Sequence, residues 1–276
     1  MFAPIIKYSG RRARPLHLGR AMIWNERQLT AAAVLCCAVN AAAQAPAKEP
    51  PPVWDVQIGA AFVGTSGNSD TSTIGADFGA HRRWTVWQIE SAATAIRATD
   101  RGTRTAERYL GSFRGDRALG PRLGLSAGER AERDHLAGID LRSITDVGLK
   151  YALVRQTQWT LDGLAALALN HESSIADVDR NDPIAVLQAV SKYMFNPPGD
   201  TLQRFTFYPD FKQSSAYRAE AEVTAQAALN SRLALKLGYL WRYSNAPVAG
   251  FMKSDNTATA SVVVRWKAAT AAASAP

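Results

Sequence analysis

The chain has 276 residues, and 47 % of them are hydrophobic, which allows one large domain or two small ones. The net charge of +8 would suit a nucleic-acid-binding protein, but residues 1–43 hold six of the 32 basic residues and only one of the 24 acidic ones. The rest of the chain keeps 26 basic and 23 acidic residues of interleaved sign, without a basic block. Nucleic acid is therefore excluded as an expected partner.

Residues 1–43 are predicted to be an export leader. Arg27 precedes an apolar, alanine-rich run from Leu29 to Ala45 that ends in small residues, which is the order of a secretory signal. Met22 opens a leader of normal proportions, so we place the start of the signal there and the cleavage after Ala43. A retained membrane anchor is the alternative. Residues 44–52 include AKEPPP and are predicted to form an extended Pro-rich linker.

From residue 53 onward the chain alternates in steps of two. Leu233, Leu235 and Leu237 alternate with Ala234, Lys236 and Gly238, and similar patterns recur to residue 267. Period two indicates strands with one apolar and one polar face. We predict strands over residues 53–63, 71–83, 86–98, 105–117, 122–134, 140–153, 158–171, 183–194, 201–208, 214–228, 232–244 and 256–267. Many exceed the usual five or six residues and match the 9–11 or so that a tilted membrane-crossing strand needs.

The predicted links between strands alternate in length. Long or polar links are expected around GTSGNSD, TDRGTRT, DHLAGID, SSIADVDRNDP, PDFKQSS and NAPVAGFMKSDN, and short ones near Trp84, ALGPR, RQTQ, NPPGD and ALNSR. Outer-membrane barrels alternate in this way, with tight turns on one side and longer loops on the other.

Aromatic residues are predicted to gather on the short-link side. Trp and Tyr favour the membrane–water interface because an apolar ring carries a polar N–H or O–H group. The candidate interface residues are Trp54, Trp84, Trp87, Trp159 and Trp266. The alternative is that these rings fill a core.

These patterns together predict an all-β, antiparallel, up-and-down transmembrane barrel of about 12 strands over residues 53–267. In lipid every unpaired backbone N–H or C=O is costly, so strands can cross only as a closed sheet with its polar faces inside. The candidate lumen-facing residues are Asp55, Asp77, Arg108, Arg114, Asp146, Arg218, Glu220, Glu222, Lys236 and Arg242. Because both signs are interleaved, we expect a crowded or weakly selective interior. Alternatively, these charges only brace the wall.

The segment VGTSGNSDTSTIGADFGAHRRW, from Val63 to Trp84, resembles the opening hairpin of the domain-of-unknown-function family 481, whose members are also called salt-induced outer membrane proteins. TAERY (Thr105 to Tyr109), residues 137–150 and residues 233–266 are similar too, so the resemblance covers nearly all of residues 53–267. It implies an outer-membrane barrel and offers no catalytic residues. One departure is that Lys267 and the tail AATAAASAP follow Trp266, where such barrels commonly end on an aromatic residue. Residues 268–276 are expected to be disordered.

No catalytic, cofactor-binding or metal site is predicted, and an enzyme is not expected. The sequence triplet His171-Glu172-Ser173 is not read as a catalytic triad, because its members are only neighbours along the chain. We expect a monomer in the cell outer membrane, with outer-membrane lipid and the barrel assembly machinery as its partners. It would be a structural envelope protein or a narrow, weakly selective pore. The alternatives are a barrel enzyme acting on lipid, which needs a Ser–His pair on the outer wall, and a soluble periplasmic β-protein that binds a ligand.

Overall fold

The computed structural model describes residues 54–65, 71–176, 179–196 and 199–268. The predicted leader, the linker and all but the first residue of the predicted tail lie outside these residues. In the described part of the chain, no helix has the length and hydropathy of a membrane span.

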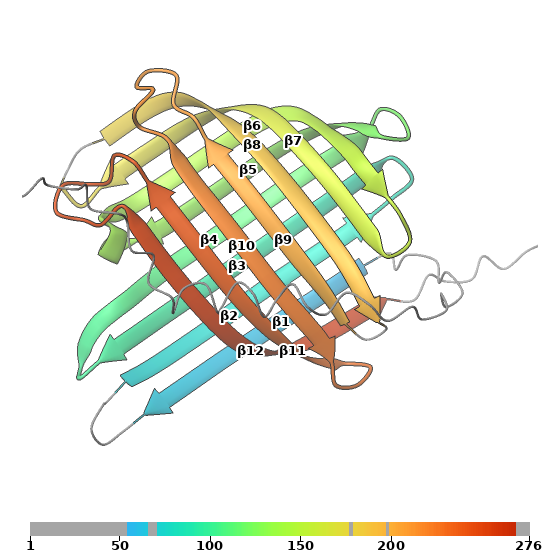
Figure 1. Ribbon diagram of the computed structural model, residues 1–276, viewed down its shortest axis with the longest axis horizontal. Coiled ribbons are helices and arrows are strands. Elements are labelled where there is room, and N and C mark those ends of the chain that lie inside the picture. The colour runs from blue at the N-terminus through green and yellow to red at the C-terminus, as the bar shows by residue number, and fades with distance from the viewer. Residues whose placement is uncertain (1–53, 66–70, 177–178, 197–198, 269–276) are drawn as a thin grey trace, which may run out of the picture. The chain divides into compact units, whose positions relative to one another are not determined.

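Twelve strands form one closed antiparallel barrel in which each strand pairs with its neighbours in chain order (Figure 1). Their bounds are β1 Trp54–Thr65, β2 Thr71–Arg83, β3 Trp87–Asp100, β4 Thr103–Ala118, β5 Leu123–Asp134, β6 Ile139–Arg155, β7 Trp159–Ser174, β8 Asp179–Asn196, β9 Gly199–Tyr208, β10 Arg218–Ala228, β11 Leu233–Ser244 and β12 Ser254–Ala268. A single 3-10 turn, η1 His135–Ala137, joins β5 to β6. The fold class and the order of the twelve predicted strands are confirmed.

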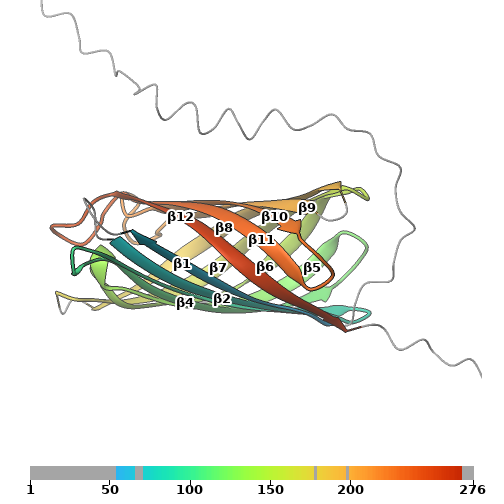
Figure 2. The same ribbon diagram turned by 90° about the horizontal axis from the view of Figure 1, so that it is seen from below.

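The barrel closes where the first strand meets the last. Trp54 pairs with Ala268, Ile58 with Val264 and Ala60 with Val262, so β1 and β12 share seven residue pairs. We call the end of the barrel where β1 begins and β12 ends the turn end, and the opposite end the loop end. β9–β11 lie on the wall that faces β2–β5 (Figures 1 and 2).

The predicted alternation of long and short links is only partly right. Long connections at the loop end are residues 209–217 and 245–253, but β3 and β4 are joined by Arg101 and Gly102 alone. Both have positive φ, 50° and 75°, as a two-residue hairpin turn requires. The polar segments TDRGTRT and SSIADVDRNDP are therefore mostly strand. A polar sequence could not distinguish a loop from a strand that continues past the apolar band, because the side chains of both are exposed to water.

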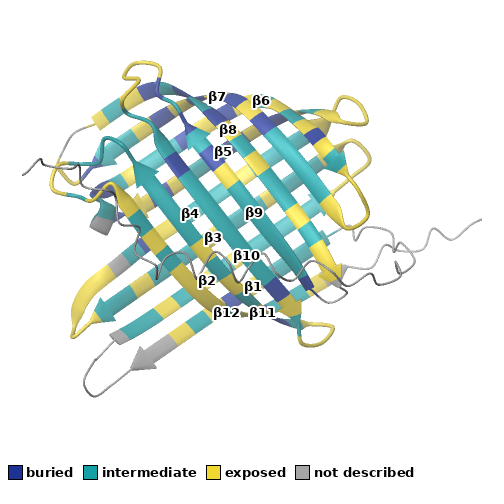
Figure 3. Cartoon of the chain, in the orientation of Figure 1, coloured by how far each residue is buried: buried dark blue, intermediate teal, exposed yellow. Residues whose placement is uncertain are grey.

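The two faces of the barrel differ as the alternation predicts, with one local exception. Outward side chains such as Phe62, Leu167 and Leu169 are 73, 66 and 69 % exposed, and Figure 3 shows exposed and less exposed residues alternating along the strands. The exception is the inner face of β6–β9, where a polar surface was expected and an apolar cluster lies instead. Its members are Ile144, Leu164, Ala166, Ala168, Ile184, Val186 and Tyr208. Because LAALAL in β7 is apolar at every position, its alternation could not show which face was inside.

Candidate functional site in the barrel interior

All ten predicted lumen residues face inward. Nine of them make ion pairs or hydrogen bonds with inner-face residues of other strands. The tenth, Asp55, shares the inward alternation of Gly59, which packs beside the inward Asp77. The structure also shows what the sequence could not, namely which of these residues meet.

A buried carboxylate, Glu132 on β5, lies at the centre of the charges near the loop end. Its Oε1 accepts a hydrogen bond from Arg142 Nη1 at 2.7 Å. Its Oε2 accepts from Arg108 Nη2 at 3.1 Å and from Arg130 Nη2 at 3.2 Å. The side chain is 3 % exposed, so the three guanidinium groups replace the water that this carboxylate would otherwise bind.

Two ion pairs cross the interior from this cluster to the facing wall. Arg130 on β5 forms a bidentate pair with Glu220 on β10, at 2.8 and 3.0 Å, and also donates to the Tyr208 hydroxyl at 2.9 Å. Arg242 on β11 donates to Asp134 on β5 at 2.7 Å. β5 and the β10–β11 pair are not neighbours in the sheet, so these bonds tie opposite walls together.

The cluster continues around the wall on both sides of Glu132. Arg142 also contacts Glu172 on β7 at 2.7 Å. Arg218 on β10 donates to the Asn170 amide oxygen at 3.1 Å, and its guanidinium lies 5.1 Å from the centre of the Tyr208 ring. We call the set Arg108, Arg130, Glu132, Asp134, Arg142, Glu172, Arg218, Glu220 and Arg242 the interior ion network.

A second group of charges lies closer to the turn end. Arg114 on β4 forms a bidentate pair with Asp146 on β6, at 2.8 and 2.6 Å, and donates to Ser126 at 2.8 Å. Ser126 and Lys150 both donate to Asp116, at 2.6 and 2.8 Å. Lys236 on β11 also meets Asp77 on β2, at 2.5 Å. Positive and negative side chains are thus paired along the interior, which partly neutralises the field there.

All five predicted interface tryptophans lie at the turn end, where β1, β3 and β7 begin, β12 ends and the β2–β3 turn passes. The guanidinium of Arg82 lies 4.9 Å from the Trp54 ring and 4.3 Å from the Trp84 ring, and that of Arg117 lies 5.6 Å from the Trp87 ring.

A second aromatic group, which was not predicted from the sequence, lies at the loop end of β9–β11. Tyr243 lies 6.0 Å from both Tyr217 and Trp241, and Phe207 lies 5.8 Å from Tyr217, between ring centres. The signal that could have found it is the outward row Tyr239, Trp241, Tyr243 at one end of a strand.

The outer wall carries a polar cluster that was also missed. Ser143 on β6 and His171 on β7 are directly paired, and His171 is paired in turn with Asn181 on β8. The required Ser–His pair of the lipid-enzyme alternative is therefore present on one outer row. Glu172, between His171 and Ser173 in sequence, faces the interior, which separates that triplet.

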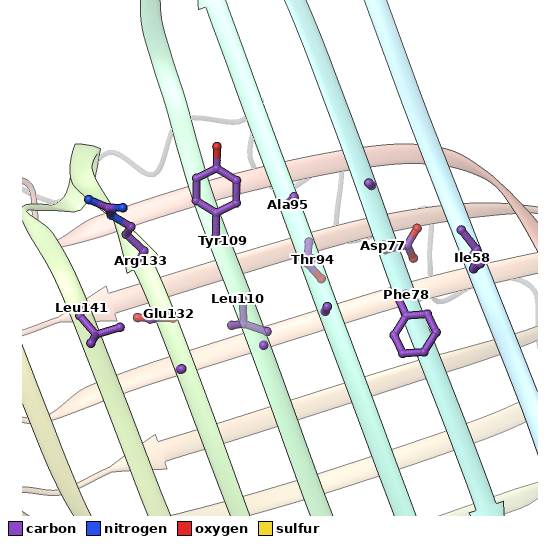
Figure 4. A pocket seen from close by; sticks show the side chains of 14 residues that line it. Ile58, Asp77, Phe78, Thr94, Ala95, Tyr109, Leu110, Glu132, Arg133 and Leu141 are labelled. Atoms are coloured by element: carbon purple, nitrogen blue, oxygen red, sulfur yellow. The ribbon is translucent and has the colours of Figure 1, made fainter.

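An apolar groove of about 550 Å³ lies on the same outer wall, across β1–β6. Ala93, Ala95 and Gly111 line it together with Phe78 and Leu141, and Figure 4 shows Phe78, Tyr109 and Leu141 around it with Arg133 beside Tyr109. In the described residues no group of three or more His, Cys, Asp or Glu side chains is placed to hold a metal ion.

Residues 58–266 match the model of the family described as Protein of unknown function, DUF481. The chain belongs to this family. The match runs from Ile58 in β1 to Trp266 in β12, so the DUF481 domain of this chain is the barrel itself, with the interior ion network inside it. No curated protein sequence matches the chain.

The DUF481 barrel is also similar to solved structures. The NanC porin is 10 % identical with a TM-score of 0.45, over 77 % of this chain and 97 % of that one. The KdgM porin in complex with disordered oligogalacturonate is 8 % identical with a TM-score of 0.40, over 77 and 98 %. The translocator domain of the autotransporter NalP from Neisseria meningitidis is 11 % identical with a TM-score of 0.40, over 88 and 94 %.

Proposed function

We propose that this protein is a β-barrel of the bacterial outer membrane, with a narrow, weakly selective interior that is held shut at rest by the interior ion network. The closed sheet leaves no strand edge, and its outer face is apolar, which is what crossing a bilayer demands.

The spacing along β7 supports a membrane-crossing wall. Trp159 at the turn end and Leu169 are ten residues apart on the outward face. A strand rising about 3.3 Å per residue at a tilt of about 45° covers roughly 23 Å in that distance. This matches the apolar band of about 25 Å that outer-membrane barrels present to lipid. The second aromatic group, at the loop end of β9–β11, suits the opposite interface.

The observation that carries the proposed closure is the pair of cross-wall contacts, Arg130–Glu220 and Arg242–Asp134. They span the interior beside the apolar cluster on β6–β9, whose Tyr208 hydroxyl accepts a hydrogen bond from Arg130, so a solute has to displace paired charges in order to pass. Five arginines and four carboxylates make up the network, which is a near balance of sign and supports weak selectivity.

Conductance in planar bilayers tests this proposal. We expect small single-channel currents from the wild type, with similar permeability to potassium and chloride. Replacing both partners, Arg130→Ala with Glu220→Ala, should raise the conductance several-fold without leaving a new unpaired charge at that contact. Arg104→Ala with Glu107→Ala removes an ion pair of β4 outside the interior and should change nothing. A strongly selective wild-type channel, or a double variant with unchanged conductance, would contradict the proposal.

A purely structural barrel is the second candidate, and the apolar cluster on the inner face of β6–β9 favours it. It predicts that the wild type and the Arg130→Ala, Glu220→Ala variant both carry no current, although both insert into the bilayer.

The cellular setting is part of the same proposal. We propose that residues 1–43 direct export, that the assembly machinery inserts the barrel, and that it remains a monomer of the salt-induced type. Fractionation should leave it with the outer membrane, whereas the alternative of a soluble ligand-binding protein predicts the periplasm. The amount of protein in cells grown at low and high sodium chloride tests the salt-induced assignment.

A further inference from the structure

The outer wall holds a row of three polar side chains on adjacent strands, Ser143, His171 and Asn181. His171 Nδ1 lies 2.7 Å from Asn181 Oδ1. Because an amide oxygen only accepts hydrogen bonds, Nδ1 is the donor in this contact, and in the neutral imidazole the lone pair is then on Nε2. An imidazole whose ring is oriented by a hydrogen bond at Nδ1 can act as a general base through Nε2.

The row lies where the outer wall changes from apolar to polar side chains. The outward residues toward the turn end include Val147, Leu167 and Leu169, all more than half exposed. Yet Glu129 on β5 also faces outward, and its carboxylate accepts a hydrogen bond from Ser143 Oγ at 2.6 Å and one from Thr145.

The depth of the row suits the ester region of a lipid. His171 lies twelve residues from Trp159 along β7, roughly 28 Å of height by the same rise and tilt. That places it just beyond the apolar band of about 25 Å, at the interface of the loop end.

The apolar groove reaches this row. Ala131, which lines the groove, is the direct partner of Ser143 on the neighbouring strand, and Leu141 lies two residues from Ser143 on the same face of β6. Arg133, also in the lining, is about half exposed. It contacts Asp140 and His135 through Nη2 and Nε. Its Nη1 makes no hydrogen bond within the described residues, so it is available to a phosphate.

We propose that Ser143, His171 and Asn181 form a site that hydrolyses an acyl ester of a phosphate-bearing membrane lipid, with the acyl chain in the groove and the phosphate near Arg133. The inference rests on the proposed membrane location and is independent of conduction. Ser143 is the nucleophile, His171 the general base, and Asn181 a positioning residue.

The reaction proceeds in two balanced steps. Ser143 Oγ attacks the ester carbonyl carbon while His171 Nε2 takes the hydroxyl proton. The bond from the carbonyl carbon to the lipid alcohol oxygen then breaks, and His171 returns the proton to that oxygen. Water attacks the acyl-serine, His171 takes its proton and hands it to Ser143 Oγ, and a fatty acid leaves. Facing side chains on paired strands have Cβ atoms about 4.5–5.5 Å apart, so a rotation of Ser143 away from Glu129 brings Oγ within reach of His171.

The first test uses the full-length barrel, purified from membranes in detergent, with phosphatidylglycerol as substrate. We expect the wild type to release fatty acid and Ser143→Ala to lose at least ~100-fold of that activity. Ser91→Ala, a control on the outer face of β3, should keep it. A fluorophosphonate should label the wild type on the peptide that contains Ser143. Asn181→Ala should lower kcat with little change in KM, and Asn181→Asp should restore part of it.

The second test asks whether the groove holds the chain. A Cβ added at Gly111 or at Gly115 meets nothing within 4 Å, so larger side chains fit at both outward positions of β4. Gly111→Leu fills the groove and should reduce hydrolysis of a C16 ester at least tenfold while sparing a C4 ester. Gly115→Leu lies outside the groove and should affect neither.

Three outcomes overturn the inference. They are fatty-acid release that Ser143→Ala does not change, absence of both release and labelling in the wild type, and equal loss for C16 and C4 esters in Gly111→Leu. Outer-membrane fractionation and heat-modifiable gel mobility, measured on the same preparations, test the membrane location independently. A folded barrel in the outer membrane that does not hydrolyse lipid would therefore contradict this site alone.

Discussion

At the residue scale, the packing of the interior depends on which buried charged side chains pair with one another. Alternation alone assigned ten charged residues to the inner face, because a strand's side chains point to opposite faces in turn. It could not pair Arg130 with Glu220, which lie on strands that are not neighbours. That pairing depends on how the sheet curves, because only the closed barrel brings β5 and β10 face to face across the interior.

Glu132→Gln should be the most damaging single change in the network. It leaves Arg108, Arg130 and Arg142 without the carboxylate they share, and removing one partner of a buried ion pair costs about 3–5 kcal/mol. Urea unfolding in detergent measures the loss. Glu222→Gln is the matched control, since its side chain is 33 % exposed and, within the described part of the chain, forms an ion pair with Arg204 alone, so about 1 kcal/mol or less is expected. Equal losses would mean that Glu132 is not the centre of the network.

Among the described glycines, Gly148 on β6 has the least room toward neighbouring backbone atoms. A Cβ there would lie 2.2 Å from the Ala165 backbone oxygen and 2.4 Å from Ala166 Cα, so the β6–β7 backbone would have to move. Gly148→Ala should destabilise the barrel by about 1–3 kcal/mol. Gly115→Ala, which meets open space, should stay within about 0.5 kcal/mol in the same unfolding experiment. A Gly148→Ala variant as stable as wild type would contradict this close approach.

At the scale of the strand, period two predicted twelve elements in the right order but not their ends. β4, β6, β7 and β8 have 16, 17, 16 and 18 residues, longer than the predicted strands. Their polar ends pair as well as their apolar middles, because backbone hydrogen bonds do not depend on side-chain polarity. The same pairing brings Ser143 beside His171, which no spacing in the sequence indicates.

Cysteines at the β1–β12 seam test closure. Ile58 and Val264 are directly paired, so Ile58→Cys with Val264→Cys, in a chain with Cys36→Ser and Cys37→Ser, should form a disulfide under mild oxidation. The oxidised protein should keep its folded gel mobility in urea concentrations that unfold the reduced form. Ile58→Cys with Ala258→Cys places the second thiol six residues along β12, about 20 Å away, and should not cross-link. Equal cross-linking of both pairs would show that the seam has no fixed register.

At the scale of the whole molecule, the apolar outer wall determines whether water or lipid can surround the barrel. The apolar face has no other strand or helix against it in the described residues, so water or lipid must cover it. Patches of this size on a water-soluble monomer are rare, which favours lipid.

Ala165→Arg tests that preference directly. Ala165 is exposed in the middle of the outward row of β7, six residues from Trp159, and an arginine near the bilayer midplane costs about 2–4 kcal/mol. The free energy of folding into phospholipid vesicles, monitored by gel mobility, should become less favourable by that amount. Val86→Arg, in the β2–β3 turn at the interface, should cost about 1 kcal/mol or less. A soluble protein would tolerate both changes equally.

The sequence by itself determined the repeating strand pattern, the two faces of most strands and the even count that lets a meander close, because these follow from local alternation. Only the tertiary structure decided which charges meet across the interior, which strands line it with apolar residues, and that Ser143, His171 and Asn181 share one row. Those relations join residues far apart in the chain, and they exist only once the barrel's closure and register fix the distances between its walls.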